Sequence, residues 1–293
     1  MSFSTQLKQE LLSIENIKPC CMLSETYGLI LFSKSFSKRS MFLNTENSQV
    51  AERYYSCINR LAVDGVSFTK SDSGKCKVSV NSEASRLRVL SAFGFSGNER
   101  SRRINWANIE NDCCLYSFIR GVFLACGNIS DPEKSYHVEF CVPYSLKNDL
   151  LRVLGEIELK PKEIKRNNNY YLYFKDSEDI LTLLASIGAN NSVLEFTGVK
   201  IFKDMRNNIN RKTNFENANL DRTVNAALVQ TEAILKLKKQ GKFNTLPTEL
   251  RQLAQLRLDN PDLSLKEIGE MLEPPLSRSG VNHRLQKLIN LSQ

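Results

Sequence analysis

The stretch Phe118–Ser130, FIRGVFLACGNIS, decides how the N-terminal two-thirds of this chain folds. Large apolar residues surround Gly121, and a second glycine, Gly127, closes the run. A glycine inside an apolar helix lets a neighbouring backbone approach closely, because it carries no Cβ. The stretch therefore predicts a buried helix that packs tightly against another helix.

A related segment, YGLILFSKSFS over 27–37, lies 93 residues earlier and places Gly28 opposite Gly121. Each glycine-containing segment is followed by the same predicted order of a strand, a helix, two strands and a helix. An internal repeat of this kind predicts two units related by a pseudo-two-fold axis. Gly28, Gly121 and Gly127 are the predicted structural seam between them.

The segment Ile119–Gly127 resembles the LAGLIDADG helix of homing endonucleases. Those enzymes pair two such helices and hold divalent metal on an acidic residue at each helix tip. The equivalent positions in this chain are Leu31 and Ser33 in the first repeat, and Leu124 and Cys126 in the second. Hard divalent cations prefer oxygen ligands, and these four side chains offer no carboxylate. We therefore expect a LAGLIDADG-like scaffold with no catalytic residues, no metal, no cofactor and no nuclease activity.

The eight cysteines raise the separate question of a zinc site. No C-x-x-C pair occurs, and both histidines, His137 and His283, are remote in sequence from any pair of cysteines. Adjacent cysteines such as Cys20 and Cys21 do not easily form a disulfide with each other. The sequence favours free thiols that behave as small hydrophobic residues in a reducing compartment, without a metal site.

The composition is that of a globular protein with a basic C-terminal end. Hydrophobic residues make up 41% of the chain and charged residues 25%, and no apolar run approaches the ~18 residues that a membrane span needs. The N-terminal segment contains charges and does not read as a signal peptide, so we expect a cytoplasmic protein. Of the net charge of +8, residues 200–293 contribute +6, which predicts a polyanionic partner there.

Residues 246–290 predict three consecutive helices. The first lies in LPTELRQLAQLRLDNP and ends before the last proline of that stretch, Pro261. The second, LSLKEIGEML, begins with a capping box of Ser264 and Glu267. Two adjacent prolines then interrupt the chain, and Ser277 caps the last helix, RSGVNHRLQKLIN. A short break between the last two of three helices is typical of a helix-turn-helix.

The polar face of this last helix predicts contacts with DNA. Arginine, serine and asparagine side chains contact bases and phosphates in the major groove, and His283 fits such a contact better than catalysis or metal binding. The alternative is a three-helix packing module with a solvated polar face. The arrangement resembles the promoter-reading fourth region of sigma factors. The predicted DNA-binding residues are Lys266, Ser277, Arg278, Ser279, Asn282, His283, Arg284 and Lys287.

The order of these parts resembles one family over nearly the whole chain. A degenerate LAGLIDADG pair is followed by the connector NINRKTNFENANLDRTVNAALVQTEAI (208–234) and by the run SRSGVNHRL, as in the WhiA-type bacterial transcription regulators. The implied fold class is α+β, a duplicated LAGLIDADG-like αββ unit followed by an all-α helix-turn-helix domain. The expected domains are a first repeat with an N-terminal helix, a second repeat, a helical connector and the helix-turn-helix domain, over 1–110, 111–206, 207–243 and 244–293.

The resemblance also implies a function: sequence-specific DNA binding in transcriptional regulation. In the family this role is tied to sporulation, and to cell division and chromosome segregation in non-sporulating bacteria. It implies double-stranded DNA as a partner, another transcription factor or RNA polymerase as a protein partner, and a nucleoid-associated location. Two alternatives stay open: a residual metal-dependent DNA endonuclease, and a module that senses a ligand or partner and is coupled to DNA binding.

Overall fold

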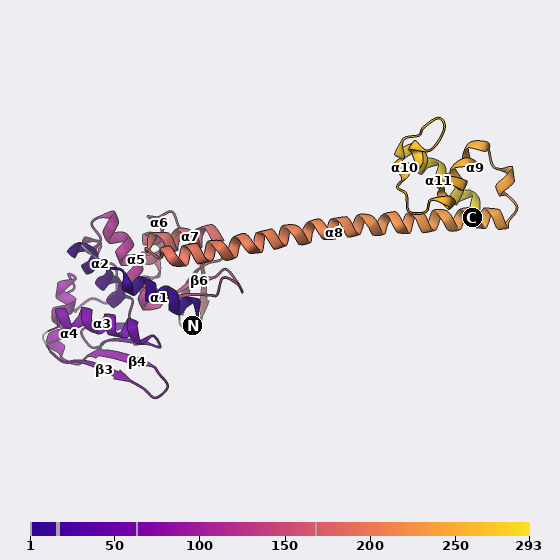
Figure 1. The fold of residues 1–293 in the computed structure, drawn as a ribbon. Coiled ribbons are helices and arrows are strands. Elements are labelled where there is room, and N and C mark those ends of the chain that lie inside the picture. The colour runs from indigo at the N-terminus through magenta and orange to yellow at the C-terminus, as the bar shows by residue number, and fades with distance from the viewer. Residues whose placement is uncertain (1, 16–17, 63, 168) are drawn as a thin grey trace. The chain divides into compact units, whose positions relative to one another are not determined.

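The computed structural model describes residues 2–15, 18–62, 64–167 and 169–293 (Figure 1). The chain divides into two compact units, Met1–Lys203 and Asp204–Gln293. The first unit combines helices with two sheets, and the second is helical. This division into an α+β unit and an all-α unit confirms the predicted fold class.

The first unit consists of two repeats with the same order of elements, preceded by helix α1 (Phe3–Ser13). The first repeat comprises α2 (Pro19–Leu31), β1 (Ser35–Phe36), β2 (Met41–Thr45), α3 (Ser48–Leu61), β3 (Val66–Lys70), β4 (Cys76–Val80) and α4 (Glu83–Ala92). A short 3-10 helix, Trp106–Asn108, lies between the repeats. The second repeat comprises α5 (Asp112–Cys126), β5 (Gly127–Ile129), β6 (Val138–Val142), α6 (Tyr144–Gly155), β7 (Lys162–Arg166), β8 (Asn169–Phe174) and α7 (Ser177–Ser186).

Each repeat thus contains one more strand than the sequence predicts. The additional strands are β1, which is separated from the end of α2 by three residues, and β5, which follows α5 directly. With two and three residues they are too short to display the alternation of apolar and polar residues by which a strand is recognised. The repeat is therefore α-β-β-α-β-β-α rather than the predicted order with a single strand after the first helix.

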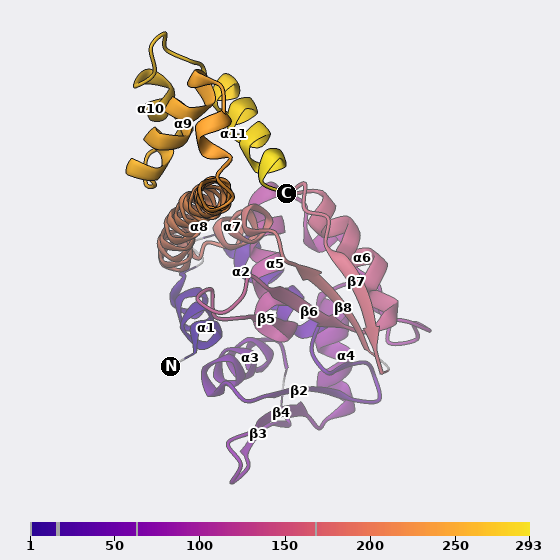
Figure 2. The same ribbon diagram turned by 90° about the vertical axis from the view of Figure 1, so that its right-hand side faces the viewer.

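The two sheets have the same antiparallel topology, with strand orders β1-β2-β4-β3 and β5-β6-β8-β7. The register pairs buried residues with buried residues, as Leu43 with Val78 and Phe140 with Leu172. Because alternate residues of a strand face the same side, this register gives each sheet one apolar face. Figure 2 shows α2 and α5 side by side near the middle of the unit.

Helices α2 and α5 approach each other through two glycines. A Cβ on Gly28 would overlap the carbonyl oxygen of Phe118, and a Cβ on Gly121 would overlap that of Glu25. Any side chain at either position would force the two backbones apart. Gly127 does not lie between the two helices but at the junction of α5 and β5. A Cβ there would collide with the ring of Phe123, one turn earlier in α5.

A buried cluster of charges also crosses this helix pair. The two carboxylate oxygens of Glu25 in α2 accept hydrogen bonds from Arg120 Nε of α5 and Arg53 Nη2 of α3, each at 2.9 Å. Glu25 is 2% exposed and Arg120 6% exposed. Charges of opposite sign and directed hydrogen bonds offset the cost of removing these groups from water. The cluster therefore fixes α2 against both α3 and α5.

Helix α8 (Asn190–Lys239) begins in the first unit and continues into the second, so it starts well before the predicted connector at 207–243. Its start is held by Glu10 of α1, whose carboxylate accepts hydrogen bonds from the backbone N–H of Asn191 (2.6 Å) and of Ser192 (3.0 Å). The second unit continues with a 3-10 helix (Phe243–Thr245), α9 (Thr248–Asp259), α10 (Leu265–Glu270) and α11 (Arg278–Ser292). Within the described residues, no helix is long and apolar enough to cross a bilayer.

Candidate nucleic-acid interface

The last three helices pack around an apolar core that also includes the end of α8. Its buried members come from all four helices and, at Leu272, from the segment after α10: Ile234, Leu237, Leu250, Leu253, Ala254, Ile268, Leu272, Val281, Leu285 and Leu288. One charged side chain, Arg257 of α9, lies within this unit and is only 1% exposed. Its Nε donates to Gln230 of α8 at 2.9 Å and its Nη1 to the carbonyl of Leu263 at 2.6 Å. Arg257 thereby holds the segment before α10 against α8 and α9.

The start of α10 is fixed by the predicted capping box. Ser264 N–H donates to the carboxylate of Glu267 at 2.7 Å, and Glu267 N–H donates to the Ser264 hydroxyl at 3.3 Å. Hydrogen bonding to the carboxylate from the Ser264 hydroxyl and from the Ser264 backbone N–H favours the ionised form, so it lowers the pKa of Glu267 below its ordinary value. The box satisfies two backbone groups that would otherwise lack partners at a helix N-terminus.

Helix α11 is positioned by a close approach to α10. A Cβ on Gly269 would overlap the carbonyl oxygen of Leu276 and would lie 3.1 Å from a methyl group of Val281. The carbonyl of Gly269 also accepts a hydrogen bond from Leu276 N–H at 2.9 Å. Ser277 then caps α11 by accepting from Gly280 N–H at 3.3 Å. The N-terminal end of α11 is therefore held in place from both sides of the turn.

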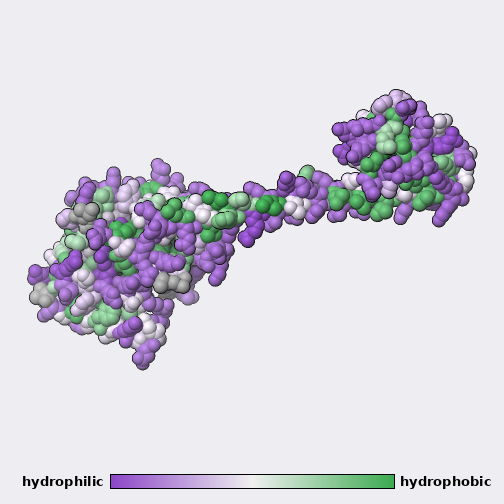
Figure 3. Space-filling view, in the orientation of Figure 1, coloured by the Kyte–Doolittle hydropathy of each residue, from purple (hydrophilic) through white to green (hydrophobic). Residues whose placement is uncertain are grey.

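Five of the predicted DNA-binding residues lie on the exposed side of α11. Val281, Leu285 and Leu288 face the core, whereas the other face carries charged and hydrogen-bonding groups. Figure 3 shows that hydrophilic residues dominate the visible surface of this unit. The exposed set comprises Arg278, Ser279, Asn282, His283 and Lys287.

The remaining three predicted residues have local partners. The Ser277 hydroxyl caps α11. Arg284 Nη2 lies 2.7 Å from the carboxylate of Glu249 in α9, and its side chain is 29% exposed. Lys266 lies 3.8 Å from Glu270 on the surface of α10, where both side chains are largely exposed. A surface pair of this kind is weak, so Lys266 can exchange its partner for a phosphate more readily than Arg284 can.

The structure also places the four positions at which homing endonucleases carry metal-binding acids. Leu31 and Leu124 are buried apolar side chains. The Ser33 hydroxyl donates to the carbonyl of Ser35 at 3.1 Å, and the Cys126 thiol donates to the carbonyl of Val122 at 3.4 Å. Burial raises the pKa of Cys126, so the thiol stays protonated.

Cys126 borders a groove of 1330 Å³ that is lined by polar side chains from α1, β2, β4 and the start of β5. Lys8 of α1 also lines it, and burial lowers the pKa of this amine. Among the described residues of the lining, Glu46 alone carries a carboxylate, and its side chain is 82% exposed. This donor set does not fit a hard divalent cation, because such ions require several converging oxygen ligands.

Comparison with known proteins identifies the relatives of this chain. A family model for the WhiA LAGLIDADG-like domain matches residues 115–206, and one for the WhiA C-terminal HTH domain matches residues 209–292. The probable cell division protein WhiA of Ruminiclostridium cellulolyticum is 39% identical over 305 residues, which cover 100% of this chain and 97% of the relative. The protein of the same name in Bacillus subtilis is 37% identical over 311 residues, with 100% and 96% covered. The chain belongs to the WhiA family.

A solved structure shows the same fold. Full-length DUF199/WhiA from Thermotoga maritima superposes with a TM-score of 0.61 at 24% identity, covering 100% of this chain and 98% of that one. Membership of the WhiA family confirms the resemblance that the glycine helices, the connector and the last helix predict. The C-terminal unit of this chain is a helix-turn-helix domain, a class of domain that binds DNA. The WhiA relatives are named as cell division proteins and not as enzymes.

Sequence reasoning missed several side chains that organise this WhiA-family chain. Glu25, Arg120 and Arg257 are buried charges with defined partners. Their signal in the sequence is a charged residue on the apolar face of a predicted helix. Lys8 left no such signal, because lysines are common on the polar face of an amphipathic N-terminal helix.

Proposed function

We propose that this chain is a sequence-specific transcriptional regulator in which α11 contacts bases and the LAGLIDADG-like unit is a scaffold without nuclease activity. The observation that carries the proposal is the exposed group of Arg278, Ser279 and Asn282 at the N-terminal end of α11, on a helix fixed by packing against α10. In a helix-turn-helix, this end of the last helix meets the base edges. Arginine pairs well with guanine, and asparagine with adenine.

The charge distribution supports the same proposal. Residues 200–293 carry most of the net positive charge, and His283 and Lys287 extend the exposed polar face of α11. Each neutralised phosphate releases counterions, so binding should weaken steeply as salt is raised. The names of the relatives suggest that the regulated genes serve cell division, and we extend that role, with chromosome segregation and sporulation, to this chain. Another transcription factor or RNA polymerase stays a predicted protein partner.

The proposed loss of nuclease activity rests on the donor set at the tips of α2 and α5. Two leucines, one serine and one half-buried cysteine occupy the positions of the metal-binding acids. The amine of Lys8 lines the same groove as Cys126, so a basic group lies where an endonuclease would gather carboxylates. The purified protein is expected to leave supercoiled plasmid intact in magnesium and in manganese. Nicking that is abolished by a chelator would contradict this part of the proposal.

Whether α11 contacts bases can be tested by comparing substitutions in α11 with a substitution in α10. Preferred sites are first selected from random duplexes with the full chain, and binding is then measured on a preferred and a scrambled duplex at several salt concentrations. Arg278→Ala and Asn282→Ala should each reduce the discrimination between the two duplexes by about 1–3 kcal/mol. Lys266→Ala should weaken binding to both duplexes by the same factor and should reduce the salt dependence.

The control is Gln252→Ala, which truncates an exposed residue of α9 and should leave binding unchanged. Equal losses on both duplexes for the two α11 variants would show that α11 contacts only the phosphate backbone. A further comparison uses residues 204–293 and residues 1–203, the two compact units. Residues 204–293 should still bind the preferred duplex. Tighter binding by residues 1–203 would contradict the proposal that the second unit binds DNA and the first is a scaffold.

A further inference from the structure

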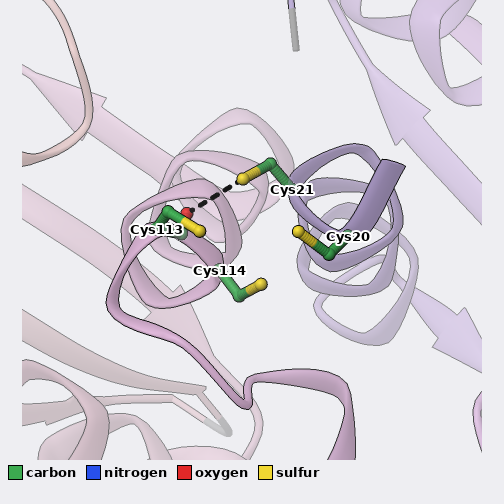
Figure 4. A group of neighbouring side chains, drawn as sticks. All are labelled: Cys20, Cys21, Cys113 and Cys114. Carbon is green, nitrogen blue, oxygen red and sulfur yellow. Dashed lines mark hydrogen bonds between the residues drawn. The ribbon is translucent and has the colours of Figure 1, made fainter. Parts of the chain in front are cut away.

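Four cysteines converge at the N-terminal ends of the two central helices. Cys20 and Cys21 lie in the first turn of α2, and Cys113 and Cys114 lie in the first turn of α5. All four sulfur atoms lie within 4.8 Å of one another. Figure 4 shows Cys20 and Cys114 facing each other across the two helices, while the Cys21 thiol donates to the carbonyl of Cys113 at 3.5 Å.

The two pairs are equivalent positions of the repeat. Cys20 and Cys113 are 93 residues apart, as are Cys21 and Cys114, and the same spacing separates Gly28 from Gly121. Because the chain has no C-x-x-C pair, the local spacing of its cysteines predicts free thiols without a metal site. Here each repeat supplies an adjacent pair, and the pseudo-two-fold packing of α2 against α5 brings the pairs together. The repeat spacing is the signal that could have found the group.

Four thiols around one point match the ligand set of a tetrahedral thiolate site. With Zn–S bonds of about 2.3 Å, neighbouring sulfur atoms of such a site lie about 3.8 Å apart. The sulfurs of this group are already within 4.8 Å, so small rotations of the side chains are sufficient. A disulfide would require only two of the four cysteines. Thiolates are soft ligands, and four of them in tetrahedral arrangement select zinc over magnesium or calcium.

The helix ends offer a suitable electrostatic environment. Zinc with four thiolates carries a net charge of −2, and a helix N-terminus stabilises negative charge through its dipole and its unpaired N–H groups. Among the residues that the structure describes, no side chain caps α2 or α5, and the same holds for α6 and α9, whereas a side chain caps α1, α3, α4, α7, α10 and α11. Pro19 has no N–H, and Cys114 N–H already donates to the carbonyl of Asn111 at 2.8 Å, so the helix-end N–H groups that can still face sulfur are those of Cys20, Cys21, Asp112 and Cys113.

Burial of the four cysteines also suits a structural ion. Cys21 and Cys114 are buried, Cys113 is half-buried, and Cys20 is exposed. An ion can thus enter from the Cys20 side and become shielded on the other. We propose that Cys20, Cys21, Cys113 and Cys114 bind one zinc ion, which links the first turns of α2 and α5 and so ties the two repeats together.

The primary test is the metal content of the full-length protein. The chain is expressed in zinc-supplemented medium and purified under reducing conditions, and zinc is measured by inductively coupled plasma mass spectrometry and by native mass spectrometry. One zinc ion per chain is expected. Cys20→Ser/Cys114→Ser should lose the ion, whereas the matched control Cys57→Ser/Cys141→Ser should retain it, because those two cysteines lie outside the group.

A second measurement needs no variant and therefore holds even where the double variant fails to fold. The zinc-free wild-type protein is titrated with cobalt, and a tetrahedral thiolate site gives intense sulfur-to-cobalt charge-transfer bands that saturate at one equivalent. Zinc should then displace the cobalt. Chelation should lower the melting temperature reported by Trp106, the single tryptophan, which lies in the first unit.

Three outcomes would overturn the proposal. Zinc content that is the same in the wild type and in a folded Cys20→Ser/Cys114→Ser variant would place any ion elsewhere. A cobalt spectrum without charge-transfer bands would exclude thiolate ligation. A mass that shows a disulfide between the two helices in the protein as purified, with no zinc gained after reduction, would make the group a redox pair instead.

Discussion

Helices α5 and α11 are each 15 residues long, but α5 buries nine of its residues and α11 buries four. Each is positioned by a glycine whose Cβ would overlap a backbone carbonyl: for α5 this is Gly121 against Glu25 of α2, and for α11 it is Gly269 of α10 against Leu276 in the turn before α11. In α5 nearly every face is used for packing. In α11 the packed face leaves Arg278, Ser279 and Asn282 in solvent. Substitutions in the central pair should therefore change stability, and those on the exposed face of α11 should change binding.

The largest expected effect comes from the buried charges of the central pair. Glu25→Ala would remove the buried carboxylate that pairs with both Arg120 and Arg53. Removing one partner of a buried ion pair costs about 3–5 kcal/mol. We expect a loss of that size in the free energy of unfolding, measured by urea titration of the full chain with Trp106 fluorescence as the probe.

The matched control is Glu46→Ala. Glu46 pairs with Lys75 at 3.9 Å, and both side chains are more than two-thirds exposed. An exposed pair contributes roughly 0–1 kcal/mol, so this variant should unfold close to the wild type. Equal losses for the two variants would show that the Glu25 cluster is no more important for stability than a surface pair.

A smaller loss is expected from Gly121→Ala. The added methyl group would overlap the carbonyl of Glu25 and approach Leu29 N at 2.9 Å, so α2 and α5 would have to move apart. Overpacking of this kind costs about 1–3 kcal/mol. Gly198→Ala in α8 provides the opposite case, because its Cβ would meet nothing within 4 Å. There, replacement of a helical glycine should stabilise the unit by about 0.5–1 kcal/mol. The same urea titration distinguishes the two signs, and a neutral Gly121→Ala would argue against a rigid seam.

These cases also indicate how far the sequence alone can predict the molecule. The internal repeat predicts the duplicated unit, and local turns and periodic apolar positions predict the three last helices. Turns and periodicity can be recognised because the residues that form them are close together along the chain. Partners such as Glu25 with Arg120 (95 residues apart) depend on how the repeats pack. The same is true of the cysteine group. The ion pair between Arg284 and Glu249 depends in the same way on how α9 and α11 pack in the second unit. Contacts of this kind cannot be derived from local pattern, except where the repeat spacing itself is used.

A third prediction concerns the tip of α5. Cys126→Asp restores one carboxylate at a position where homing endonucleases bind metal, beside the amine of Lys8. Leu31, Ser33 and Leu124 still supply no charge, so no divalent cation should bind and no DNA should be cleaved. We expect a loss of about 1 kcal/mol in stability, since the new charge is partly desolvated but has Lys8 as a partner. Magnesium-dependent nicking of plasmid by this variant, absent in the wild type, would mean that one carboxylate at the helix tips is sufficient for DNA cleavage.

The smallest expected effect lies in the second unit, where the capping box makes stability depend on pH. Hydrogen bonds from Ser264 lower the pKa of Glu267 in the folded state below its value of about 4.3 in the unfolded chain. Their contribution is therefore complete above the unfolded pKa and is lost as the pH falls through the folded one. Glu267→Gln can still accept the Ser264 N–H but does not titrate, so it isolates this contribution. In thermal melts of residues 204–293 followed by circular dichroism, the wild type should exceed Glu267→Gln at neutral pH, and the difference should vanish in acid. A difference that grows in acid would reverse the sign and would show that the folded state of α10 favours the protonated carboxyl group.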